Sequence, residues 1–110
     1  MKRDGPYLQH IIDAIDSIRE YTRDGRDAFM RDTKTQDAVI RKFEIIGEAT
    51  KRLDAETKAR RPDIAWREIA GLRDVLIHNY MGVNLKRVWG VVEHRLQPLR
   101  EAVMELLGQD

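Results

Sequence analysis

Apolar residues recur every three or four positions along the chain, and this spacing is typical of helices that bury one face. The first such stripe consists of Leu8, Ile11, Ile12, Ile15 and Ile18. Pro6 suits the first turn of this helix, and Gly25 lies beyond its end. No alternation of period two persists beyond a few residues, so the sequence predicts no strand.

The same spacing predicts further helices. After a turn at 28–30, a long second helix begins at a cap on Asp32 or Thr33 and runs into 55–61, where Pro62 ends it. A third helical segment covers 64–81. A fourth helix starts near Asn84 and reaches Leu96, and Pro98 begins or kinks a fifth. We therefore predict an all-α, single-domain protein over 1–110, an antiparallel bundle of four to five helices.

Composition limits the possible functions. A chain of 110 residues has a modest core and can leave an apolar face for a partner. The net charge of +1 argues against a general electrostatic binder of nucleic acid. Because 14 of the 20 basic residues are arginine, a local phosphate site remains open. The chain has no cysteine, which excludes disulfides, thiolate catalysis and cysteine metal sites. No signal peptide or membrane span is evident, so we expect a cytoplasmic protein.

Histidine is the first candidate for acid–base catalysis near neutral pH. His10 adjoins the first apolar stripe and is interpreted as structural, whereas His94 shares a helix face with Arg87. His78 lies in the segment 71–80, where polar side chains interrupt an apolar pattern. Metal-free cleavage of RNA needs an acid–base group and a cation beside the phosphoryl oxygens. Arg73 and His78 are chemically suited to these two roles.

The spacing of this pair raises a geometric question. On a continuous helix, five residues place Arg73 and His78 about 140° apart, whereas Tyr80 returns to the face of Arg73. Two explanations are open. Either the helix starts or distorts within the motif, or two chains contribute to one site across a symmetric interface.

The pattern Arg73-x4-His78-x-Tyr80 resembles the R-x4-H-x-Y motif of HEPN-domain proteins, specifically the HepT-like toxins paired with a minimal nucleotidyltransferase (MNT) antitoxin. The resemblance extends over essentially the whole chain. Segments 35–41 and 45–49 look like the second helix of the family, and 62–74 looks like its approach to the motif. Segments 80–83 and 88–89 look like its exit.

This resemblance implies a homodimeric, metal-independent endoribonuclease without a cofactor, whose partners are its RNA substrate and the antitoxin. It further implies a toxin that is neutralised when the antitoxin attaches AMP to Tyr80. Arg73 would contact the phosphate and His78 would be the acid–base residue. The pair Arg87 and His94 lies outside the motif and is interpreted as a coincidence of spacing.

Neighbouring residues have open interpretations. Glu48 either holds the Arg73 guanidinium or is an ordinary surface carboxylate. Asp74 is either a bystander or a partner of His78, and Asn79 is expected to support the site. Asn84 replaces an aspartate that is common in relatives, a nearly neutral change for a helix cap. Gly47 is expected to permit close helix packing. Trp66 and Trp89 are expected in the core, although an exposed aromatic could stack on a base.

Two other functions remain to be weighed against a ribonuclease toxin. One is a non-catalytic helical dimer that binds the nucleotidyltransferase and presents nucleotide or substrate to it. The other is a helical DNA-binding regulator, which a net charge of +1 does not favour. The intact set of Arg73, His78 and Tyr80 favours the ribonuclease, because a scaffold needs none of them.

Overall fold

The computed structural model describes residues 2–78 and 82–109. In chain order its elements are η1 (Lys2–Asp4), α1 (Gly5–Tyr21), α2 (Arg26–Arg31), α3 (Thr33–Lys51), α4 (Ala55–Ala59), α5 (Trp66–Ala70), α6 (Leu72–Leu76), β1 (Ile77–His78), β2 (Gly82–Val83), α7 (Leu85–His94) and α8 (Leu96–Gly108). The described chain is thus almost entirely helical, as predicted. None of its described helices is both long enough and apolar enough to cross a membrane.

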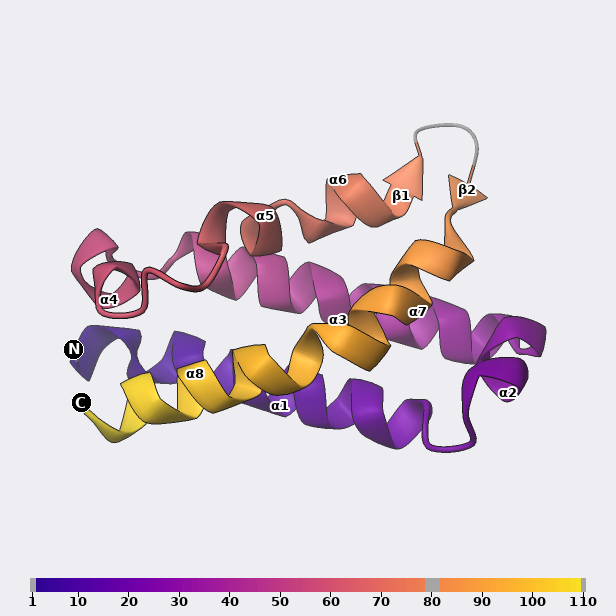
Figure 1. The fold of residues 1–110 in the computed structure, drawn as a ribbon, viewed down its shortest axis with the longest axis horizontal. Helices are drawn as coiled ribbons and strands as arrows, with labels where there is room; N and C mark the ends of the chain where they lie inside the picture. Colours follow the sequence, from indigo (N-terminus) through magenta and orange to yellow (C-terminus); the bar gives the residue numbers. More distant parts are fainter. Residues whose placement is uncertain (1, 79–81, 110) are drawn as a thin grey trace.

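The helices form an antiparallel bundle (Figure 1). α3 returns beside α1, α5 and α6 run back along α3, and α7 and α8 lead the chain to the end where α1 begins. α3 packs on α1, α5 and α6, and α8 packs on α1. The predicted architecture is therefore confirmed, although several short helices lie between the long ones.

The core lies where α1, α3 and α8 meet. Every member of the predicted α1 stripe is buried. The stripe forms one cluster with buried residues of α3 and α8, namely Val39, Phe43, Ile46, Leu99, Val103 and Leu106. Trp66 is buried in the same cluster. Trp89 packs against the cluster, and its ring centre lies 5.4 Å from the ring centre of Phe29. The prediction of a core tryptophan is confirmed for Trp66, whereas Trp89 is only partly buried where it packs against the cluster. Burial of each large apolar side chain contributes roughly 1.5–3 kcal/mol.

Two predicted features near α3 are wrong in detail. Residues 28–30 belong to the short helix α2 and not to a turn. α3 ends at Lys51 instead of running into 55–61, which form the separate helix α4 and its end. The Asp4 side chain, only 2% exposed, accepts hydrogen bonds from the Asp54 backbone N–H (3.0 Å) and the Thr57 hydroxyl (2.6 Å). These bonds fix the turn before α4 against the start of α1.

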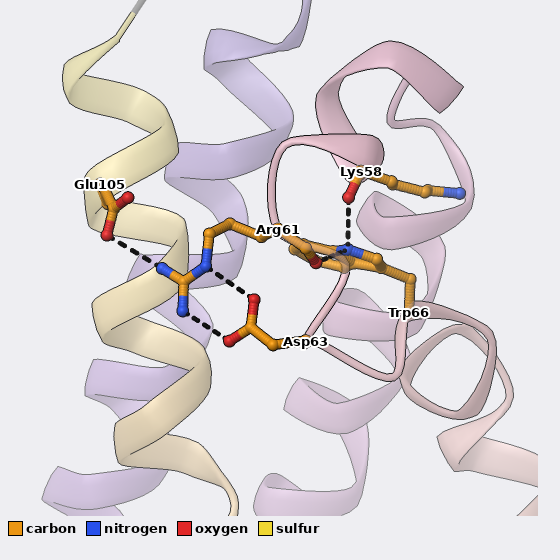
Figure 2. Close-up of polar contacts among 5 residues, drawn as sticks. All are labelled: Lys58, Arg61, Asp63, Trp66 and Glu105. Atoms are coloured by element: carbon orange, nitrogen blue, oxygen red, sulfur yellow. Dashed lines mark hydrogen bonds and ion pairs between the residues drawn. The ribbon is translucent and has the colours of Figure 1, made fainter.

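The loop around Pro62 ends α4 and positions α5 (Figure 2). The Arg61 guanidinium donates to both carboxylate oxygens of Asp63 (2.9 and 2.8 Å) and to Glu105 of α8 (3.0 Å). These hydrogen bonds lower the pKa of the Asp63 carboxyl from its ordinary value. The Trp66 indole N–H is shared between the carbonyl oxygens of Lys58 (3.1 Å) and Arg61 (3.0 Å). The first residue of α5 is therefore held against the loop that precedes it.

The third predicted helix, 64–81, is not continuous. α5 ends at Ala70, and the N–H of the next residue, Gly71, bonds to the carbonyls of Arg67 and Glu68; α6 ends at Leu76. The next two residues form β1, which pairs antiparallel with β2, so the prediction of no strand is wrong here. The Leu76 carbonyl accepts the Asn84 N–H (3.1 Å). This local pairing of β1 with β2 thus uses backbone groups that would otherwise extend the helix.

The C-terminal part follows the predictions closely. The Asn84 side chain accepts the Arg87 N–H (3.1 Å) and caps α7, as expected. α7 ends at His94, so Leu96 belongs to α8 and not to the fourth predicted helix. Pro98 lies in the first turn of α8, where its missing N–H has no helical partner to lose.

Gly47 lets α3 and α5 approach closely. A Cβ atom at this position would lie 3.1 Å from the Ala70 carbonyl oxygen. The expectation that Gly47 serves helix packing is therefore confirmed. Gly90 in α7 differs, because a Cβ atom there would meet nothing within 4 Å.

These two glycines give a matched prediction for stability. Gly90→Ala should raise the free energy of unfolding by about 0.5–1 kcal/mol, because alanine is the better helix former and meets no obstacle. Gly47→Ala should not show this gain, because its methyl group presses on the Ala70 carbonyl oxygen. Urea unfolding followed by circular dichroism measures both. Equal stabilisation by the two substitutions would contradict the close approach at Gly47.

Candidate functional site

The motif residues Arg73 and His78 lie on two different elements. The backbone of Arg73 is in α6, and the backbone of His78 is in β1, opposite Gly82 of β2. The helix therefore ends between them, as the first of the two explanations proposed. The calculated separation of 140° and the return of Tyr80 to the Arg73 face both assume a continuous helix, so neither applies. Asn79 and Tyr80 lie outside the described residues.

Backbone contacts fix the position of this junction. α6 packs against α3 and α7. The bond from the Asn84 N–H to the Leu76 carbonyl joins the end of α6 to the residue that caps α7. The two strands pair Ile77 with Val83 and His78 with Gly82. The segment from Arg73 to His78 is thus attached at its end to the start of α7.

The two carboxylates that were expected near the motif are both exposed. Glu48, on α3, has its described ion pair with Lys51 one turn later, at 3.9 Å. It also lines a surface cavity of about 420 Å³ between α1 and α3, together with Tyr7, His10 and Arg52. Asp74 lies on α6 beside Arg73 in sequence. The roles proposed for Glu48 and Asp74 therefore stay predictions.

The other two histidines occupy different surfaces. His10 is exposed on α1 and contacts the Tyr7 ring edge-on, with 6.5 Å between ring centres. His94 is exposed at the end of α7, and its Nε2 lies 3.2 Å from Glu93 Oε1. His94 and Arg87 both line a groove of about 590 Å³ beside α6. The face of α7 that Arg87 and His94 share therefore lies beside α6, the helix that carries Arg73.

We call this feature the α6–α7 groove. Its lining residues come from α5, α6, α7 and the residue after α7, namely Glu68, Leu72, Leu76, Arg87, Gly90, Val91, His94 and Arg95. Sequence reasoning missed Arg95 and Gly90, because the groove exists only once α6 packs against α7 and Glu68 of α5 pairs with Arg95. Periodicity within α7 was the only signal available, and it identified Arg87 and His94 alone.

Within the described part of the chain, no group of three or more His, Asp or Glu side chains is arranged to hold a metal ion. Arginine is instead the frequent charged residue near the motif, with Arg73 on α6 and Arg87 and Arg95 in the groove. Guanidinium groups bind phosphate oxygens through paired N–H donors. The described site is thus chemically suited to a phosphate-containing ligand.

These features place the chain among small helical-bundle proteins whose candidate chemistry depends on arginine and histidine. The model of the family described as "Ribonuclease HepT-like" matches residues 11–106. The chain therefore belongs to the HepT-like ribonuclease family, and the resemblance seen in the sequence is confirmed.

Curated relatives carry related names. A protein of Thermococcus cleftensis named "Probable ribonuclease HepT" is 45% identical over 95 residues, covering 86% of each chain. A "Putative RNase" of Caldanaerobacter subterraneus is 36% identical over 111 residues, covering 100% of this chain and 99% of that protein. A protein of Methanocaldococcus jannaschii named as a gamma-glutamylcyclotransferase and putative RNase is 43% identical over 104 residues. The matched residues make up 94% of this chain but only 47% of that protein. No solved structure matches the chain.

Proposed function

We propose that the chain is a metal-independent endoribonuclease whose site is formed by Arg73 and His78. The observation that carries the proposal is the junction of α6 and β1, which places the two residues on either side of a helix end in a member of a ribonuclease family. Because the helix ends between Arg73 and His78, the separation of 140° expected on a continuous helix does not apply to them, and we propose that both residues act on one phosphate. The RNA itself supplies the nucleophile, which is the ribose 2′-hydroxyl.

The proposed reaction uses the ribose as nucleophile. The 2′-hydroxyl oxygen bonds to phosphorus and the bond to the 5′-oxygen breaks, leaving a 2′,3′-cyclic phosphate and a 5′-hydroxyl. Either His78 accepts the 2′-hydroxyl proton and water protonates the leaving 5′-oxygen, or His78 protonates the 5′-oxygen and water accepts the 2′-hydroxyl proton. Arg73 holds the phosphoryl oxygens through its fork of N–H donors, where negative charge builds up in the transition state. Neither role requires a metal ion.

We further propose that the protein is a toxin controlled at Tyr80 by a nucleotidyltransferase antitoxin. Two residues of chain span at most about 7 Å, so Tyr80 cannot be far from His78 whatever the backbone does between them. An AMP group on the tyrosine hydroxyl would add bulk and a phosphate charge close to where RNA must bind. That phosphate could take the place of the substrate phosphate on Arg73.

The working form in this proposal is a homodimer whose interface borders residues 72–78. The support is the small size of the domain and the family resemblance, since the helical angle between Arg73 and His78 no longer argues for it. We expect light scattering at micromolar concentration to give twice the mass of one chain. A stable monomer that still cleaves RNA would contradict this part of the proposal.

Cleavage itself is tested with the purified chain, total RNA and EDTA. We expect cleavage in EDTA and products with a 2′,3′-cyclic phosphate. His78→Ala should lower the rate on the order of 10²-fold or more, as for other acid–base residues. Arg73→Lys should also be slow, because an ammonium group lacks the bidentate fork. The matched control is His10→Ala, which removes an exposed histidine of α1 and should keep the parental rate.

Two outcomes would overturn the catalytic proposal. Activity that disappears in EDTA and returns with magnesium would exclude the metal-independent reaction. A chain that folds but never cleaves RNA would instead favour the non-catalytic dimer that presents nucleotide or substrate to the nucleotidyltransferase.

Control at Tyr80 is tested by co-expression with a neighbouring nucleotidyltransferase and measurement of intact mass. We expect added AMP that maps to Tyr80, and a Tyr80→Phe variant that stays toxic in the presence of the active antitoxin. Tyr21→Phe is the matched control, because Tyr21 is 41% exposed on α1, and it should be modified and neutralised like the parent. Modification at another residue, or full neutralisation of Tyr80→Phe, would exclude Tyr80 as the point of control.

A further inference from the structure

The α6–α7 groove lies directly beside the motif. Two of its apolar lining residues, Leu72 and Leu76, belong to α6 and stand on either side of Arg73 in sequence. Leu76 is followed by β1, which contains His78. A ligand that occupies this groove therefore lies against the same five-residue helix that carries Arg73.

Positive charge in this groove is only partly balanced. Arg95 pairs with Glu68 across the groove (3.0 Å), and His94 is close to Glu93. The Arg87 guanidinium, on the exposed face of α7, has no hydrogen-bond or ion-pair partner among the described side chains. An exposed arginine without a carboxylate partner is available for an anion from outside the chain.

Gly90 keeps the centre of the groove open. It lies one turn after Arg87 and one turn before His94, and a Cβ atom there would meet nothing within 4 Å. Glycine inside a helix is unfavourable, and packing within the described chain does not require it here. Its absent side chain leaves room for a ligand to approach the α7 backbone closely.

We propose that the α6–α7 groove binds the ribose–phosphate backbone of single-stranded RNA next to the bond that is cleaved, with Arg87 as the phosphate-binding residue. The inference rests on the proposed ribonuclease function and adds the path of the substrate. Arg87 and His94 are about 10.5 Å apart along the helix axis. The groove is therefore long enough to lie along a stretch of single-stranded RNA, instead of holding a single phosphate. Leu72 and Val91 offer apolar contact to sugars and base faces.

Arg87, which has no ion-pair partner among the described side chains, favours RNA over a second copy of the chain as the occupant. A helix of another copy could also pack on Gly90, but its approach would desolvate the Arg87 charge, which is costly unless a carboxylate pairs with it. A phosphate backbone instead brings the compensating charge with it and releases counterions on binding. The test below separates these two occupants.

The experiment measures both binding and cleavage. Binding is followed by fluorescence anisotropy with labelled 2′-O-methyl RNA, which lacks the free 2′-hydroxyl and so resists the proposed reaction. The variants are Arg87→Gln, which removes the proposed phosphate contact, and Gly90→Leu, which fills the groove. The matched control is Lys86→Gln, which removes one positive charge from the first turn of α7 outside the groove.

We expect Arg87→Gln to raise the Kd for RNA on the order of tenfold and to lower the salt dependence of log K by about one unit. In cleavage assays it should raise KM and leave kcat near the parental value. Gly90→Leu should weaken binding as well, while its circular dichroism spectrum and melting remain those of a folded helical protein. Lys86→Gln should bind nearly as tightly as the parent.

Three results would overturn the inference. Binding that is equally weakened by Arg87→Gln and Lys86→Gln would show general charge attraction without a groove site. Binding that is unchanged in Arg87→Gln would exclude its phosphate contact, even if the parent cleaves RNA and the proposed function stands. A change of oligomeric state in Gly90→Leu with unchanged RNA affinity would identify the groove as an interface between copies. Groove-dependent binding by a parent that never cleaves RNA would instead contradict only the proposed catalysis.

Discussion

The hydrogen bond from the Asn84 N–H to the Leu76 carbonyl, with the short ladder beyond it, controls the geometry of the functional region. It occupies the last carbonyl of α6 and so ends that helix within the motif. It also holds the residue that caps α7 against α6. The direction of α7, the presence of a groove between the two helices and the position of His78 relative to Arg73 all follow from this backbone pairing.

α6 is only five residues long, and helices of this length have little stability of their own. Its position therefore comes from its neighbours. Gly47 allows α5 to lie close to α3, and the Trp66 indole fixes the start of α5 to the loop in which Arg61 binds Asp63 and Glu105. Residues distant from the motif in sequence thus determine where the motif segment lies.

The placement of individual arginines matters more in this molecule than its net charge. A net charge of +1 gives no general attraction for nucleic acid, and several described arginines, among them Arg61 and Arg100, form ion pairs with carboxylates. Arg87 lines the groove beside α6 and has no carboxylate partner among the described side chains. In the proposed ribonuclease, substrate binding would depend on a few guanidinium groups, and we expect salt to affect it through a small number of phosphate contacts.

The sequence by itself determined the helical class, the buried face of α1, the cap at Asn84 and the identity of the family, because each depends on local spacing or on residues read in order. It did not determine where α3 and the third helix end. The break between α3 and α4 is held by Asp4, which bonds to Asp54 and Thr57 far along the chain. The end of the third helix goes with the bond between Leu76 and Asn84, which pairs α6 with the start of α7. Only the tertiary structure decided that Arg87, His94 and Arg95 share a groove with α6, because a groove between helices has no signature within either one.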